Sequence, residues 1–207
     1  MILYDYVLSA SCYKVRLMAA LLGQDLTIKA VNFHPEREHR SPQMLALNPA
    51  GTLPILVDGE LTLADTAEIL RHMTRAAPQW QGNDDNWLAF AVTLNETLGL
   101  ARLHDVLGYD ADIETVRRSG VLALRVLEAA LCERRFDGGL YLTGPHPTIS
   151  DIACFPNVAL APDGGVSLDP YPSIRLWMRA IRSLEGFVEM PGIFRLHDLA
   201  PAPEIKR

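Results

Sequence analysis

Three side chains near the start of the chain, Ser9, Ser11 and Cys12, are of types that can stabilise or form a thiolate. They lie where the apolar segment at residues 2–6 gives way to a helical pattern. A helix N-terminus offers unpaired backbone N–H groups and a positive potential, and both favour an anionic sulfur. A serine hydroxyl there could donate to a bound thiolate, and Cys12 could itself ionise. The structural alternative is a serine N-cap beside a buried cysteine.

The elements that must position these residues alternate between strand and helix over the first third of the chain. Short apolar segments bounded by turn residues indicate strands, and apolar residues at helical spacing indicate the helices between them. This order, βαβ followed by ββα, predicts a mixed α/β domain over residues 1–77. The expected elements are a strand at 2–6, a helix ending at Gly23, a strand at 26–31, a hairpin of 53–57 with 61–63 that turns at Asp58-Gly59, and a helix capped by Asp65 or Thr66.

Helical periodicity replaces this alternation after a polar stretch near residue 80, and predicts an all-helical domain over residues 85–207. Within the first domain, residues 33–42 are a polar stretch before the hairpin, and neither a helix nor a strand is predicted there. Thr148 and Asp151 have the spacing of a capping box in which Asp replaces the usual Glu. The expected helices cover residues 87–107, 115–135, a segment opening at Thr148, and 172–186.

Composition narrows the function classes. The net charge is −6 and basic residues do not cluster, so we expect no general nucleic-acid surface. No apolar run approaches the roughly 20 residues of a membrane span, and we expect no membrane association. The cysteines, Cys12, Cys132 and Cys154, are widely separated and lack metal-ligand spacing. Free thiols in a reducing, cytoplasmic compartment are therefore expected, without a metal.

Together, the motifs resemble the soluble glutathione transferase family over nearly the whole chain. Residues 3–16 are similar to the serine-containing N-terminal motif of its bacterial and zeta-type members. Residues 48–54, Asn-Pro-Ala-Gly-Thr-Leu-Pro, are similar to its N-P-x-G-x-x-P loop, and residues 148–151 match the capping box of its helical domain. The resemblance implies a thioredoxin-like N-terminal domain that binds glutathione, followed by a helical domain that contributes the acceptor-substrate pocket.

The resemblance also implies roles for individual residues. Ser9 stands at the position of the family's catalytic serine, where its hydroxyl would stabilise the glutathione thiolate. Ser11 stands where zeta-type and beta-type enzymes have cysteine, and Cys12 follows one residue later, so all three are retained as catalytic candidates. The remaining assignments are glutathione binding by His39, Leu53, a cis Pro54, Asp65 and Thr66, and an acceptor pocket that includes Tyr13 and Arg102.

The activity implied is conjugation, or another use of the glutathione thiolate against a small electrophile, with glutathione as co-substrate. A homodimeric, cytoplasmic enzyme of detoxification is expected. Two other enzymatic readings stay open, a glutathione-dependent cis–trans isomerase of the maleylacetoacetate type and a Cys12-based thiol–disulfide oxidoreductase. A non-catalytic, glutathione-binding scaffold is the alternative of another class.

Overall fold

The computed structural model describes residues 1–82 and 85–190 of the 207-residue chain. Its N-terminal part contains four strands, β1 (Ile2–Asp5), β2 (Thr27–Ala30), β3 (Ile55–Asp58) and β4 (Leu61–Leu63). The sheet order is β2-β1-β3-β4. β1 and β2 are parallel, whereas β1 with β3 and β3 with β4 are antiparallel. The predicted βαβ and β-hairpin units are therefore confirmed.

The antiparallel pairing of β1 with β3 determines where the first loop of the chain lies. Tyr4, near the end of β1, is opposite Ile55, the first residue of β3. The loop that leaves β1 and the loop that enters β3 consequently meet at one edge of the sheet. Leu3, opposite Ile28 and Leu56 in the sheet, is fully buried and anchors β1 in the core.

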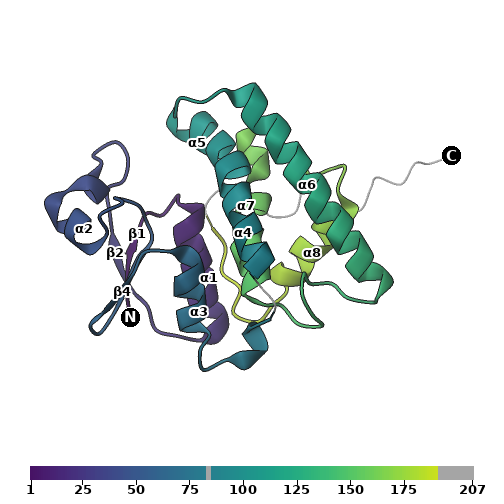
Figure 1. Ribbon diagram of the computed structural model, residues 1–207, viewed down its shortest axis with the longest axis horizontal. Coiled ribbons are helices and arrows are strands. Elements are labelled where there is room, and N and C mark those ends of the chain that lie inside the picture. The colour runs from purple at the N-terminus through teal and green to yellow at the C-terminus, as the bar shows by residue number, and fades with distance from the viewer. Residues whose placement is uncertain (83–84, 191–207) are drawn as a thin grey trace.

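Two helices cover one side of this sheet. α1 (Ala10–Leu22) begins after Ser9 and ends at Gly23, whose left-handed φ of 61° lets its N–H bond the last turn. α3 (Thr66–Met73) begins after Asp65, the predicted cap. Figure 1 shows α1 and α3 between the sheet and the other helices, with α2 (Pro42–Leu47) beyond the sheet on the far side.

The connection expected at residues 33–42 contains more structure than predicted. A 3-10 turn, η1 (Glu38–Arg40), precedes α2. Ser41 caps α2 by accepting a hydrogen bond from the Met44 N–H at 3.3 Å, and Pro42 occupies its first turn. Met44 is the one buried residue of this six-residue helix. Such a helix is too short to produce the repeated apolar spacing on which the sequence prediction depends.

The remainder of the described chain is helical. Between residues 64 and 190, positions 83–84 apart, every regular element is a helix or helical turn, and none of the helices in the described ranges could cross a membrane. The elements that follow α3 are η2 (Pro78–Trp80), α4 (Asp85–Leu94), η3 (Asn95–Gly99), α5 (Leu100–Leu107), α6 (Ile113–Phe136), α7 (Ile149–Ala159), η4 (Ala161–Gly164) and α8 (Pro172–Arg182).

The helix predicted at residues 87–107 is interrupted. Its middle is the π-helical turn η3, in which the Thr97 hydroxyl donates to the Thr93 carbonyl at 2.7 Å. A π-turn places an extra residue in one turn and so rotates the side chains that follow it. α4 and α5 therefore present different faces to their neighbours, and residues 95–99 reach the junction between the two parts of the molecule.

That junction is formed by α1 and α3 packing against α7. Thr148 and Asp151 make the capping box predicted for α7. Asp151 is fully buried and also accepts hydrogen bonds from the Leu142 N–H at 3.0 Å and the Trp177 indole N–H at 2.8 Å. One carboxylate thus joins the loop before α7, the helix itself and α8.

Lys14 is a charged residue in this junction and should weaken it. The side chain is 4% exposed, and burial lowers the pKa of Lys14 to about 8, although Cys154 and Asp65 oppose the shift. Replacement by methionine should raise the free energy of unfolding at pH 7 by about 2–3 kcal/mol, because the buried ammonium is removed. Urea denaturation measures the change, with exposed Lys29→Met as the control.

The gain from Lys14→Met should depend on pH in a defined direction. Between about pH 8 and pH 10.5 the unfolded chain keeps a proton on Lys14 that the folded chain releases. The free energy of unfolding of the wild type therefore rises with pH in this window. Its difference from the free energy of unfolding of Lys14→Met should shrink there. A constant difference from pH 7 to pH 10 would contradict the assigned cause.

Candidate functional site

A cavity of about 380 Å³ lies at the edge of the sheet where the loops after β1 and before β3 meet. Its wall combines these loops and η1 with η3, α5 and α7 of the helical part. A larger, more open groove of about 800 Å³ runs along α6 and contains none of the predicted site residues. The smaller cavity is the candidate site because five of the ten predicted residues line it, from both parts of the chain: Ser9, Ser11, His39, Leu53 and Arg102.

Ser9 lies in the cavity wall at the N-terminus of α1. Its Oγ accepts a hydrogen bond from the Cys12 N–H at 3.2 Å, which makes it the N-cap. Accepting this bond uses a lone pair and leaves the hydroxyl proton available for donation. Ser11 also lines the cavity. The two serines therefore meet the geometric requirement for contact with a ligand at this helix end.

Cys12 is placed differently. Its side chain is fully buried and does not belong to the cavity wall. Burial raises the pKa of the Cys12 thiol to about 12, although the hydrogen bond from Ser9 opposes the shift. A thiol with this pKa is almost entirely protonated at neutral pH, so this environment does not favour a reactive Cys12. The packing matches the structural alternative for this residue.

Tyr13 does not border the cavity, contrary to the sequence prediction. α1 directs the ring into the core, where it is fully buried and its hydroxyl donates to the Val188 carbonyl at 2.6 Å. Burial raises the pKa of Tyr13 above its usual value. Tyr13 therefore connects α1 to the segment after α8, and its hydroxyl is already used in a structural contact.

The loop before β3 supplies backbone to the site. The Leu53–Pro54 peptide bond is cis, as the resemblance implied, and Leu53 lies in the cavity wall. The Asn48 amide fixes this loop by donating to the Thr52 carbonyl at 3.0 Å and by accepting from the Ala50 N–H at 3.1 Å. Leu53 thus precedes the first paired residue of β3, where an extended peptide could add to the strand.

Asp65 and Thr66 lie outside the wall of the 380 Å³ cavity. Asp65 is exposed and caps α3 by accepting from the Glu68 N–H at 2.9 Å, and Thr66 begins the helix. The N-terminal amides of α3 provide positive potential for an anion. The two residues therefore mark a helix N-terminus separate from the cavity wall, and their predicted contact with glutathione stays a prediction.

His39 lies in the cavity wall but is poorly suited to carry charge. Its ring is 6% exposed and stacks on Phe33 at 3.9 Å, and Phe33 in turn stacks on Tyr6 at 5.4 Å. Burial first, and then Arg40 and Arg37, lower the pKa of His39 below its usual value. A neutral imidazole is therefore expected at pH 7. The exposed Arg40, which also lines the cavity, is the better partner for a carboxylate.

Arg102 enters the cavity wall from α5, and its predicted place in an acceptor pocket stays a prediction. It is 5% exposed, its Nε donates to Asp163 at 3.1 Å, and its Nη1 donates to the Leu8 carbonyl at 2.6 Å. Leu8 immediately precedes Ser9. The guanidinium thus fixes the helical part of the chain to the loop that carries the candidate catalytic serine.

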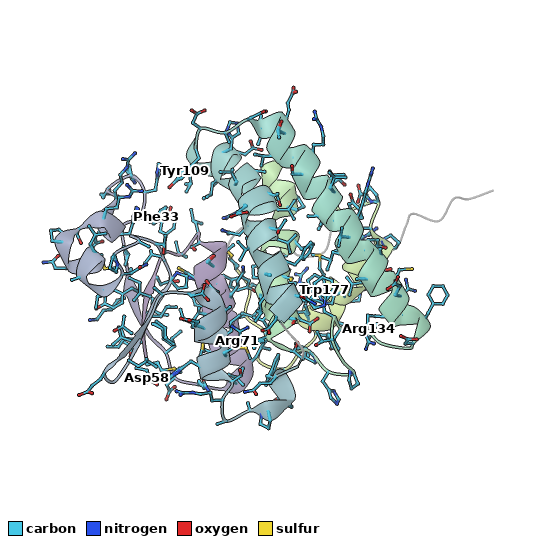
Figure 2. All side chains as sticks on the ribbon, viewed as in Figure 1. Phe33, Asp58, Arg71, Tyr109, Arg134 and Trp177 are labelled. Carbon is cyan, nitrogen blue, oxygen red and sulfur yellow. The ribbon has the colours of Figure 1, made fainter. Side chains whose placement is uncertain are left out.

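Several wall residues were missed by the sequence prediction, among them Tyr6, Arg40, Tyr109 and Asn157. The sequence placed Tyr6 at the end of the first strand, but its side chain lines the cavity. Burial raises the pKa of Tyr6. In Figure 2, Phe33 of the N-terminal part and Tyr109 of the helical part approach one another at the same edge of the molecule. The packing of two distant segments, which no local motif encodes, brings these residues together.

Within residues 1–82 and 85–190, no group of three or more His, Cys, Asp or Glu side chains is arranged to hold a metal ion. The chemically useful groups of the cavity are hydroxyls, amides, backbone N–H groups and guanidinium groups. Such groups bind and stabilise anions. The arrangement can therefore hold an anionic sulfur near Ser9 and polar groups of a ligand on the surrounding wall.

Comparison with known proteins agrees with this geometry. A family model described as the N-terminal domain of glutathione S-transferase matches residues 3–81. Maleylacetoacetate isomerase of Pseudomonas aeruginosa is 30% identical over 195 residues, which cover 84% of this chain and 87% of that protein. Glutathione S-transferase 1 of Dianthus caryophyllus is 26% identical, covering 84% of this chain and 83% of that protein.

The fold also matches solved structures. The crystal structure of a glutathione S-transferase from Xanthobacter autotrophicus Py2 superposes with a TM-score of 0.81 at 24% identity. The match covers 92% of this chain and 97% of that one, so both the sheet and the helices are shared. With the sequence match to the family at 30% identity over most of the chain, these relationships show that the protein belongs to the glutathione S-transferase family.

Proposed function

We propose that the cavity binds glutathione and that the Ser9 hydroxyl stabilises its thiolate for attack on a small electrophile. Membership of the family supports an enzyme with glutathione-using transferase activity. The observation that carries the assignment to Ser9 is its position in the cavity wall at the N-terminus of α1, where its Oγ accepts the Cys12 N–H. The positive end of α1 adds to the same preference for an anion.

In the proposed complex the peptide extends along the loops that surround Ser9. The Leu53 backbone would pair with the cysteinyl unit, as an added strand would. The γ-glutamyl end would reach Asp65 and Thr66, where a carboxylate faces the N-terminal amides of α3 and the ammonium group faces Asp65. The glycyl carboxylate would pair with Arg40, while neutral His39 forms the wall beside it.

The chemical step follows from the ionised sulfur. An unperturbed thiol has a pKa of about 8.5, so only a small fraction is ionised at neutral pH without assistance. A hydrogen bond from Ser9 favours the thiolate, whose electron pair forms a C–S bond with the electrophile. In a substitution the displaced group leaves with its bonding pair, and in an addition the neighbouring carbon receives a proton from solvent.

Glutathione-dependent cis–trans isomerisation is a second candidate. It is favoured by the 30% identical relative from Pseudomonas aeruginosa, which is named maleylacetoacetate isomerase. In an isomerase the thiolate adds to one carbon of a conjugated double bond, whose π electrons move into the neighbouring carbonyl group. The former double bond is now single and rotates, and expulsion of the thiolate re-forms it in the trans configuration, so that glutathione is not consumed. Turnover of a maleyl-type acid with constant glutathione concentration would distinguish this reaction from conjugation.

The alternative activities make different demands on the site. A thiol–disulfide oxidoreductase would need the Cys12 sulfur to reach a ligand, and its burial does not favour this. A scaffold would bind glutathione without turnover.

We also infer a cytoplasmic homodimer that acts in detoxification, as the family relationship suggests. Light scattering of the purified protein would establish its oligomeric state.

Calorimetry and ultraviolet spectroscopy test the proposal directly. Glutathione should bind with a dissociation constant in the micromolar to millimolar range, and the complex should absorb as a thiolate at a pH well below 8.5. S-methylglutathione provides the control, since it lacks the ionisable thiol and should give no thiolate signal. If glutathione does not bind at millimolar concentration, the proposed function is wrong.

A further inference from the structure

Asn157, on α7, places an unpaired amide in the cavity wall. The residue is 1% exposed, and neither its Oδ1 nor its Nδ2 has a hydrogen-bond partner. Burying an amide without hydrogen-bond partners costs free energy of folding, so an apolar residue would stabilise the fold better at this position. Because Asn157 faces the cavity, a ligand there can supply the missing donor and acceptor.

Gly99, the last residue of η3, lies close to this amide. A Cβ atom added at Gly99 would lie 3.2 Å from the Asn157 Oδ1 and 3.1 Å from the Asn95 Oδ1. Both distances are shorter than an ordinary van der Waals contact of a Cβ atom. Gly99 has helical backbone angles, so glycine is not required there by backbone conformation. Its lack of a side chain instead lets η3 approach the Asn157 and Asn95 amide oxygens closely at the cavity wall.

The cation that the helical part contributes to this wall is already paired. The guanidinium of Arg102 is paired with Asp163 and bonded to the Leu8 carbonyl. Tyr6 and Tyr109 contribute hydroxyl groups, and the lowered pKa of His39 keeps its imidazole neutral at pH 7. With Arg40 assigned to the glycyl carboxylate of glutathione, the remaining groups of the wall suit an uncharged group. Since the Asn157 amide both donates and accepts, the matching group is one that does the same.

We propose that Asn157, assisted by Asn95, selects electrophiles that carry a carboxamide, with α,β-unsaturated amides as the substrate class. The inference rests on the proposed function, because glutathione must supply the nucleophile. Its sulfur forms a C–S bond with the β-carbon, the π electrons of the double bond move to the α-carbon, and that carbon takes a proton from solvent. The carboxamide remains intact and pairs with Asn157 throughout.

Acrylamide and methyl vinyl ketone provide a matched pair of substrates, since they are similar in size and the ketone lacks the N–H donors. After subtraction of the uncatalysed rates, Asn157→Leu should lower kcat/KM for acrylamide about tenfold or more and change the ketone value less than about threefold. Gly99→Ala should lower the acrylamide value by about threefold. The same chemical change at exposed Asn86, Asn86→Leu, should affect neither substrate.

Two results would overturn the inference. An equal loss for both substrates in Asn157→Leu would show that the amide only supports the fold, and an unchanged acrylamide value would show that it contacts no substrate. Turnover of the ketone without turnover of acrylamide by the wild type would also overturn it, while leaving the proposed function intact. Absence of glutathione binding by calorimetry would instead refute the proposed function.

Discussion

Ser9→Ala is expected to lower kcat/KM for conjugation of glutathione to an aryl halide by roughly 10- to 100-fold. A hydrogen bond to a charged group contributes about 1.5–3 kcal/mol, and the thiolate loses this bond in the variant. The pKa of the bound glutathione thiol should rise by about one to two units, and the rising limb of the pH–rate profile should move upward by the same amount. Thiolate absorbance measured across a pH titration checks both changes.

Ser9 is also the N-cap of α1, and its two roles can be separated. Alanine at an N-cap costs about 1 kcal/mol of stability, whereas aspartate retains the capping acceptor but has no proton to donate when ionised. Ser9→Asp should therefore remain folded and still lose the thiolate signal. Ser11→Ala provides the comparison, with an expected change in kcat/KM of less than about threefold. Loss of the signal in Ser11→Ala alone would assign thiol activation to Ser11.

Asp151→Ala is expected to reduce the free energy of unfolding by about 4 kcal/mol or more. The carboxylate accepts hydrogen bonds from the N–H groups of Leu142, Thr148 and Trp177, and all three donors would lose this partner on truncation. Each buried group left unpaired costs about 1–3 kcal/mol. Such a loss is a large part of the 5–15 kcal/mol that stabilises a typical protein. Urea denaturation followed by circular dichroism measures the effect.

Two further variants make the Asp151 test decisive. Asp151→Asn keeps one oxygen acceptor and should cost less than alanine, and exposed Asp169→Ala should change stability by less than about 0.5 kcal/mol. The folded fraction of each variant should bind glutathione within about threefold of wild-type affinity, since Asp151 lies outside the cavity wall. A large loss of affinity in fully folded Asp151→Asn would contradict a purely structural role.

Local signals account for what the sequence predicted correctly. The cap at Ser9, the helix end at Gly23 and the box of Thr148 with Asp151 each depend on a few neighbouring residues, and the structure contains all three. The hairpin that turns at Gly59 is equally local. Features that need only short-range geometry can be predicted from residue type and spacing, because the same side chain that defines the motif also makes the contact.

The remaining features depend on packing between distant segments. The orientation of α1 decides that Cys12 and Tyr13 are buried while Ser9 lines the cavity, and spacing along one helix does not specify which face meets the sheet. The π-turn η3 has no simple sequence signature, and it brings Gly99 to the cavity. Asn157 becomes a wall residue only because α7 packs against α1, so no motif could have identified it.

The hydrogen bond from Arg102 to the Leu8 carbonyl has a consequence for how the chain unfolds. It joins α5 to the residue before Ser9, while α1 and α3 pack directly on α7. Loss of the helical part would therefore expose the apolar sides of α1 and α3 and release the loop that ends at Ser9. The two parts should lose structure in a single cooperative transition, and amide hydrogen exchange in α1 and α7 should report similar opening free energies.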